Sequence, residues 1–235
     1  MFVTATLKDN VAVTPSQFSA PPQEAITNEL NKKYANRVLL DVGLCICVFD
    51  LIWVGEGLVK YGDGCYWYKV TFRMVVFRPS RSQVIFGKIK SSTEESIRVT
   101  LGFFDDIYIP QEYLPIASVF DLNEQAFFWI PVDAESPIPT PSQLLDTDVS
   151  NRRYLDRGDI IRLRVERDEF YDNEPGPRKG ESILEERAED DVDRKAPYTI
   201  IASIQQLGLG PFSWWEGSEE TMEASASVYP VCESF

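Results

Sequence analysis

Seven side chains between positions 86 and 164 have the types and the spacing that suit the binding of single-stranded nucleic acid. Lysine and arginine pair with phosphates, and aromatic rings stack on bases. The basic and aromatic candidates are Lys88, Lys90, Arg98, Arg162, Arg164, Phe86 and Tyr108. Because they alternate with apolar residues along strand-like runs, we expect them to project outward from a sheet whose other face is buried.

Four strand-like runs would position these side chains. They cover residues 84–90, 97–101, 103–109 and 160–167. Short strands with this alternation predict a small barrel, which is the architecture with which OB-folds hold single strands. Outward lysine and arginine also keep a barrel soluble and unaggregated, so the pattern alone leaves both explanations open.

The net charge of −14 is distributed unevenly along the chain. Residues 102–150 contain nine acidic and no basic side chains, whereas residues 82–101 contain three basic and two acidic ones. Residues 151–171 contain six basic and five acidic side chains. Local patches rather than the total charge decide what a surface binds, so the acidic composition does not exclude a nucleic-acid interface.

Cysteine and histidine usage removes most catalytic and metal chemistry. The sequence has no histidine, which excludes Ser-His-Asp catalysis, Cys-His catalysis and mixed Cys/His zinc sites. Its four cysteines lack the paired CxxC spacing of a zinc site. Cys45 and Cys47 lie two positions apart in a strand-like run, so we predict that both pack on one face as small apolar residues.

Two further motifs could do chemistry. Asp105 and Asp106 form a carboxylate pair, but adjacent strand residues point to opposite faces and are not expected to chelate one ion. An enzyme built on Asp50, Asp105 and Asp106 is the catalytic alternative. Gly62-Asp63-Gly64 invites a phosphate-loop interpretation, yet no GxxxxGK[ST] or GxGxxG motif and no helix follows it. The pattern favours a plain turn.

The first 80 residues predict an antiparallel sheet with one helix. Strands are expected over 1–13, 42–54 and 66–78, and Pro79 ends the last of them. The 42–54 run is apolar at both alternating sets of positions, so we expect it to be covered on both faces. The helix begins at Pro21 and Pro22 and has apolar residues at four-residue steps on one side. These are Ile26, Leu30, Tyr34 and Val38, with Lys32, Lys33 and Arg37 near its C-terminal end.

The remaining segments are expected to elaborate the barrel. Residues 111–150 predict a long loop with one strand near 126–130, and 197–205 predicts a closing strand. Residues 172–195 are rich in charge, proline and glycine and predict a mobile acidic insertion. Trp214 and Trp215 are expected to anchor the end of the chain to its own surface or to a partner. No signal peptide and no membrane-spanning segment is predicted.

Several motifs resemble the larger stalk subunit of eukaryotic RNA polymerase III. They include Val42-Gly43-Leu44-Cys45-Ile46, Tyr61-Gly62-Asp63-Gly64, Val75-Val76-Phe77-Arg78-Pro79, Gly87-Lys88-Ile89, the run from Leu101 to Pro110 with Phe-Phe-Asp-Asp-Ile, and Ser213-Trp214-Trp215. The resemblance covers residue 1 to about residue 216. Sister subunits of RNA polymerases I and II and of the archaeal enzyme share the architecture.

The resemblance implies an α+β fold: an N-terminal α+β tip domain over 1–80 and an all-β OB-fold domain over 81–217 with inserted loops. The tail over 218–235, where the sequence departs from the family, is predicted to be disordered. It implies a non-catalytic nuclear subunit that pairs with a smaller helical subunit, contacts general initiation factors and touches nascent RNA. The Gly62-Asp63-Gly64 turn would face the polymerase core. A stand-alone OB-fold protein that binds single-stranded RNA is the alternative, and neither function needs a cofactor, a metal or a membrane.

Overall fold

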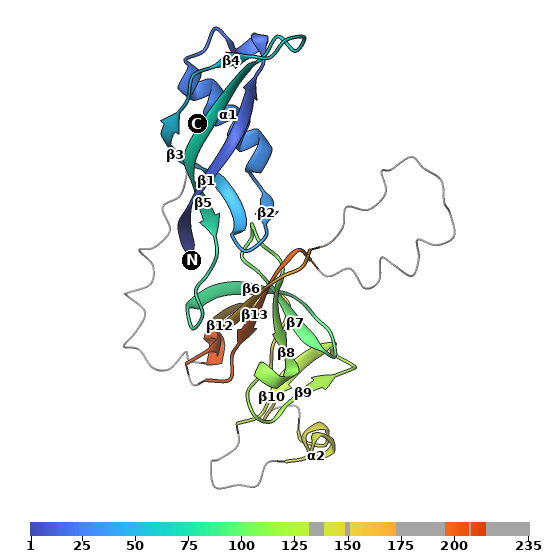
Figure 1. The fold of residues 1–235 in the computed structure, drawn as a ribbon. Helices are drawn as coiled ribbons and strands as arrows, with labels where there is room; N and C mark the ends of the chain where they lie inside the picture. The colour runs from blue at the N-terminus through green and yellow to red at the C-terminus, as the bar shows by residue number, and fades with distance from the viewer. Residues whose placement is uncertain (132–138, 149–150, 173–195, 207, 215–235) are drawn as a thin grey trace, which may run out of the picture. The chain divides into compact units, whose positions relative to one another are not determined.

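The computed structural model describes residues 1–131, 139–148, 151–172, 196–206 and 208–214 (Figure 1). The predicted acidic insertion, apart from Asp172, and the predicted tail lie outside these residues. The chain divides into two compact units, one formed by residues 1–83 and 167–200 and the other by residues 84–166 and those from 201 onwards. No helix in the described ranges is long and apolar enough to cross a membrane.

An antiparallel sheet forms the body of the first unit. Its strand order is β1 (Phe2–Val13), β5 (Tyr66–Phe77), β3 (Gly43–Val54) and β2 (Arg37–Leu39). The short strand β4 (Leu58–Val59) pairs with the beginning of β5. Strands β1 and β5 pair over their full length, from Phe2 opposite Phe77 to Val13 opposite Tyr66. The predicted sheet-plus-helix architecture is confirmed.

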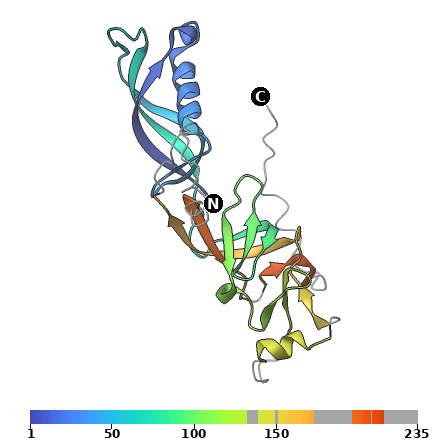
Figure 2. The same ribbon diagram turned by 90° about the vertical axis from the view of Figure 1, so that its right-hand side faces the viewer.

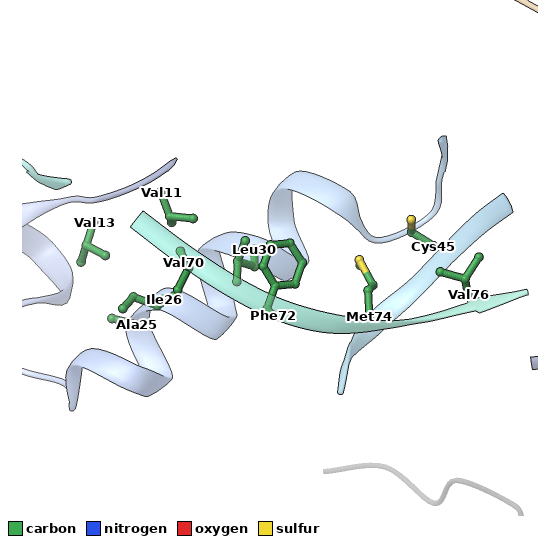
Figure 3. Packing of buried hydrophobic residues seen from close by; sticks show 10 residues of the cluster. All are labelled: Val11, Val13, Ala25, Ile26, Leu30, Cys45, Val70, Phe72, Met74 and Val76. Carbon is green, nitrogen blue, oxygen red and sulfur yellow. The ribbon is translucent and has the colours of Figure 1, made fainter. Parts of the chain in front are cut away.

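Helix α1 (Pro22–Tyr34) covers one face of this sheet (Figure 2). Its buried residues Ile26 and Leu30 belong to one hydrophobic cluster with Val70, Phe72 and Met74, which alternate along β5; Ile26 lies beside Val70 and Leu30 beside Phe72 (Figure 3). Pro22 begins the helix and Glu24 lies in its first turn, where the helix dipole favours an acidic side chain. A short 3₁₀ turn, Pro15–Gln17, precedes it.

The predicted helix was too long. The structure ends it at Tyr34, and both Val38 and Arg37 belong to β2. Asn36 has a φ of 58°, a left-handed conformation that asparagine tolerates and that turns the chain from the helix into the strand. Tyr34 and Val38 are therefore four residues apart but lie in different elements, Tyr34 in α1 and Val38 in β2.

Strand β3 departs from the prediction in two ways. The register shifts between Cys45 and Cys47, because a β-bulge inserts an extra residue there. Cys45 is consequently buried and Cys47 exposed, so the two thiols do not share a face. The outer half of β3 is also uncovered, since Phe49 and Trp53 are more than half exposed. The prediction of a strand buried on both faces was wrong beyond Cys45.

A barrel is formed by the second unit together with residues 167–170 and 198–200, which complete strands β12 and β13. Its strands are β6 (Val84–Ser92), β7 (Ser96–Thr100), β8 (Ile107–Pro110), β12 (Ile160–Phe170), β13 (Tyr198–Ser203) and β14 (Gly210–Pro211). The order is β13-β8-β7-β6-β12-β14, and β13 also pairs with β12, which closes the sheet on itself. The expected OB-like barrel and the α+β fold class are confirmed.

Alternation along the strands fills the barrel as predicted. Ile85 and Ile89 of β6, Val99 of β7 and Leu163 of β12 are buried. The third expected strand, 103–109, is shorter than predicted, because residues 103–106 form the bend that leads into β8.

Gly87 occupies an inward position at which the barrel has no room for a side chain. A Cβ there would overlap the Cγ1 atom of Val99 on the neighbouring strand. We expect Gly87→Ala to lower the free energy of unfolding by about 1–3 kcal/mol, the usual cost of overpacking. Urea unfolding measures it. Ser91→Ala, at an exposed position of the same strand, should stay within about 0.5 kcal/mol. Equal stability of the two variants would contradict the packing.

The described residues between 111 and 155 contain more secondary structure than a loop with one strand. Strands β9 (Ser118–Asp121), β10 (Ala126–Trp129) and β11 (Arg153–Tyr154) form a three-stranded antiparallel sheet. A 3₁₀ turn, Gln111–Tyr113, precedes the sheet. The short helix α2 (Pro141–Leu145) contacts β9 and begins with a capping box between Thr140 and Gln143. Only the strand at β10 was predicted.

Candidate nucleic-acid interface

The strand register brings the seven predicted residues onto the outer surface of four consecutive strands. Phe86 of β6 lies opposite Arg162 of β12, and Arg98 of β7 lies opposite Tyr108 of β8. Lys88 has Thr100 on one side and Ile160 on the other. Their buried neighbours along each strand fill the barrel, so the outward direction predicted for these side chains is confirmed.

Three of the five bases are paired within the chain. Lys90 Nζ lies 2.5 Å from Asp105 Oδ2, and Arg98 Nη2 donates to Asp106 Oδ1 at 2.7 Å. Arg164 pairs with Glu166 two residues along the same strand. These three cations already have carboxylates beside them, so each would contribute less to the binding of a phosphate than a lysine or arginine without an ion pair.

Asp105 and Asp106 are not on opposite faces of a strand. They lie in the bend before β8, and both accept hydrogen bonds from bases on the outer face. The ammonium of Lys90 and the hydroxyl of Thr100 lower the pKa of Asp105. Asp105 therefore carries its charge at neutral pH and holds Lys90. In the described ranges, no three His, Cys, Asp or Glu side chains meet in a group that could hold a metal ion.

Lys88 and Arg162 differ from the other bases. Lys88 is exposed and has no hydrogen bond or ion pair with any described residue. Arg162 has no carboxylate beside it in the described ranges. It donates to the carbonyl oxygen of Gly208 at 3.4 Å, and its guanidinium lies 5.4 Å from the ring centroid of Phe86. Of the predicted set, these two bases have charges that no described carboxylate offsets.

The two aromatic candidates already have stacking partners. Phe86 stacks on Phe212 with ring centroids 5.6 Å apart and an interplanar angle of 18°, and Arg162 also lies over its ring. The guanidinium of Arg98 lies 5.7 Å from the ring centroid of Tyr108. A nucleobase that stacked on Phe86 or Tyr108 would have to share or displace these contacts.

The last described residues, up to Trp214, are held on the chain's own surface. Trp214 packs on Trp129 of β10 with ring centroids 4.9 Å apart, and Arg153 lies 5.5 Å from the centroid of Trp129. Gly210 has a φ of 100° and lies close to the indole of Trp214, so the turn and the contact both favour glycine. Of the two alternatives for the terminal tryptophans, Trp214 takes the internal one, and Trp215 lies outside the described residues.

Comparison with known proteins covers both units. The family model described as "RNA polymerase III subunit Rpc25" matches residues 83–215. The chain is 39% identical over 216 residues to DNA-directed RNA polymerase III subunit rpc8 of Schizosaccharomyces pombe, covering 92% of this chain and 100% of that protein. The chain belongs to the RNA polymerase III subunit Rpc25 family. The resemblance stated from its motifs is confirmed.

Two other members of the Rpc25 family show the same extent of similarity. RPC8 of Bos taurus is 39% identical over 219 residues, which cover 93% of this chain and all of that protein. RPC8 of Saccharomyces cerevisiae is 38% identical over 229 residues, which cover 92% of this chain and all of that protein. The similarity to these Rpc25-family proteins therefore runs through both compact units.

The first unit of this Rpc25-family chain matches a second model, described as "SHS2 domain found in N terminus of Rpb7p/Rpc25p/MJ0397", over residues 8–64. The Gly62-Asp63-Gly64 turn lies at the end of this match. Gly62 and Gly64 have φ angles of 86° and 67°, and Asp63 Oδ2 accepts a hydrogen bond from Trp67 Nε1 at 2.9 Å. The turn is exposed and leads into strand β5 rather than a helix, as predicted. Its docking role stays a prediction.

Sequence reasoning missed Arg152, Arg153 and Trp129. Arg153 belongs to β11, which has only two residues, and Arg152 directly precedes that strand. Neither arginine therefore lies in a run long enough to show an alternating pattern. Trp129 was placed in a strand, but its contact with Trp214 joins positions far apart in the sequence. Only the three-dimensional structure brings these side chains together.

Proposed function

We propose that this chain is the larger stalk subunit of RNA polymerase III. In this proposal the first unit docks on the polymerase core, a smaller helical subunit completes the stalk, and the barrel contacts nascent RNA during initiation in the nucleus. One observation carries it: the similarity to subunits named RPC8 spans their whole length. An alignment confined to the barrel would have supported only a shared RNA-binding module.

The subunit has a binding role rather than a catalytic one. The carboxylates of the enzyme alternative are each engaged by a cation: Asp50 by Arg73, Asp105 by Lys90 and Asp106 by Arg98. Arg73 lowers the pKa of Asp50 and Lys90 lowers the pKa of Asp105, which makes each carboxylate a weaker general base. For RNA contact, the support is the pair of outward bases Lys88 and Arg162, which no described carboxylate neutralises.

Affinity purification of the tagged chain from nuclear extract, followed by mass spectrometry, tests the assembly. We expect the core subunits of RNA polymerase III and one small helical protein in near-equal amounts, retained through a moderate-salt wash. An untagged strain controls for background. Recovery of the chain as a free monomer, or bound only to RNA, would instead support the stand-alone RNA-binding protein.

A further inference from the structure

The face of the first unit's sheet that is opposite α1 carries an open groove of about 470 Å³. We name it the Trp53 groove and define it by five side chains. They are Lys8, Asn10, Trp53, Lys69 and Thr71. Along β1, Asp9 points to the other face, where it binds Lys33 and Tyr34 of α1. Along β5, Val70 points into the core (Figure 3). The alternation therefore assigns the groove to the face that α1 leaves uncovered.

The strand register fixes which groups meet in the groove. Thr71 of β5 lies between Lys8 of β1 and Trp53 of β3, and Lys69 lies opposite Asn10. Trp53 is 55% exposed, and its ring packs against the backbone of Gly55. A large apolar ring thus lies beside Gly55 on β3, and both lysines lie on the strands to one side of it, Lys69 on β5 and Lys8 on β1.

The two lysines have no partner of their own. Neither Lys8 nor Lys69 makes a hydrogen bond or an ion pair with any residue that the structure describes. Arg73, further along the same face of β5, is different, because Asp50 binds its guanidinium and Phe49 lies beneath it. The charge on this face that no described ion pair neutralises is therefore positive, and it lies at the groove.

We propose that the Trp53 groove binds an acidic segment of the polymerase core. The inference rests on the proposed stalk function and assigns the docking contact to residues other than the Gly62-Asp63-Gly64 turn. Carboxylates of the core segment would pair with Lys8 and Lys69, and an apolar side chain would cover Trp53. An aromatic anchor at the centre surrounded by a polar rim is the usual composition of a protein–protein interface, and the two lysines would belong to that rim.

The surroundings of the groove favour a protein over nucleic acid. Exposed apolar side chains continue from Trp53 along β3 and β4, namely Phe49, Ile52, Leu58 and Val59. A contiguous patch of exposed apolar side chains marks a protein–protein contact rather than a phosphate-binding surface. Two lysines beside such a patch match a protein segment that carries a few carboxylates.

Carbodiimide crosslinking of the purified holoenzyme tests the acidic character directly. The reagent joins a lysine amine to a carboxylate as an amide, with loss of one water, only where the two groups touch. We expect mass spectrometry to find Lys8 or Lys69 joined to an Asp or Glu of a core subunit. Lys32, which is exposed on α1 near Glu29, serves as the reference and should give no core link. Links from other lysines of this chain to the core, but none from Lys8 or Lys69, would overturn the proposal.

Binding to polymerase core that lacks the stalk gives the second test. We expect the Lys8→Glu/Lys69→Glu double variant and Trp53→Ala each to raise the apparent Kd at least tenfold. The Lys32→Glu/Arg81→Glu double variant changes the net charge equally and should stay within twofold. Melting temperatures measured by circular dichroism identify any variant that fails to fold.

The outcomes separate the groove from the proposed function. If the wild-type chain binds the core and all variants bind equally well, the groove is not the docking site, although the stalk function stands. If the wild-type chain does not bind the core, both fail. A 20-nucleotide single-stranded RNA is the remaining probe: if the groove variants lose RNA but keep the core, the groove is a nucleic-acid site and the proposal is wrong.

Discussion

Replacing Arg152 with alanine is expected to lower the melting temperature by about 8 °C or more. The guanidinium lies between segments that are distant in sequence. Arg152 Nη1 donates to Asp121 Oδ2 at 3.0 Å, and Nη2 donates to the carbonyl oxygens of Leu145 and Thr147 at 2.6 and 2.9 Å. Its plane also lies 4.8 Å from the ring centroid of Phe128. One side chain thus ties β9, the end of α2 and β10 together.

The cost is large because the pair is out of water. The side chains of Arg152 and Asp121 are 10% and 7% exposed. Removing Arg152 leaves Asp121 as a buried carboxylate with hydrogen bonds from Asn123 and Tyr154 but no paired cation, which costs far more than the loss of a surface ion pair. Differential scanning calorimetry measures the shift. Arg153→Ala is the matched control, because Arg153 is exposed and lies over Trp129, and it should move the transition by about 2 °C or less. Equal shifts would show that Arg152 does not hold the segment.

The contacts of Asp121 also predict that the stability of the protein depends on pH. The backbone N–H of Asn123, together with Tyr154 and Arg152, lowers the pKa of Asp121. A carboxyl whose folded pKa is lowered stabilises the protein above its unfolded pKa of about 3.9, and this contribution is lost as the pH falls through the folded pKa. Asp121→Asn should therefore be less stable than the wild type at pH 7, and the difference should shrink below about pH 4.

The faces of the strands could be predicted from the sequence, because alternation is a local property. Ile161 and Leu163 are buried, and Arg162 and Arg164 point outward, as their pattern indicated. The bulge between Cys45 and Cys47 could not be predicted, since one extra residue reverses a face without changing the composition. The period-two rule is reliable only while the register holds.

Which basic side chains of the candidate interface are neutralised by ion pairs could not be predicted from the sequence, for a different reason. The sequence places Lys90 and Arg98 on the outer face, but whether they are available depends on where the bend at Asp105 and Asp106 lies. That bend was expected to be a strand, which would have separated the two carboxylates. Of the five basic side chains predicted for the interface, the structure therefore leaves Lys88 and Arg162 without a described carboxylate partner.

This difference predicts unequal effects on RNA binding. We expect the Lys88→Ala/Arg162→Gln variant to weaken binding of a single-stranded RNA about tenfold near 100 mM salt. The slope of log affinity against log salt should fall by about 1.4, because each lost phosphate contact contributes about 0.7 for a single strand. Glutamine at 162 removes the guanidinium that lies over Phe86 but keeps the first two methylenes of the side chain, which limits the structural damage compared with alanine. Fluorescence anisotropy at four or more salt concentrations measures both quantities.

The control is the pair of bases that the chain already neutralises. Lys90→Ala/Arg98→Ala removes the same number of charges from the same surface, but Asp105 and Asp106 offset those charges in the folded protein. We expect a change of threefold or less and a slope altered by less than 0.7. Asp105→Asn makes the opposite test, because it removes the carboxylate that holds Lys90 and should strengthen binding and steepen the slope. If the two double variants lose affinity equally, the intrachain ion pairs do not control this surface; if neither does, RNA binds elsewhere.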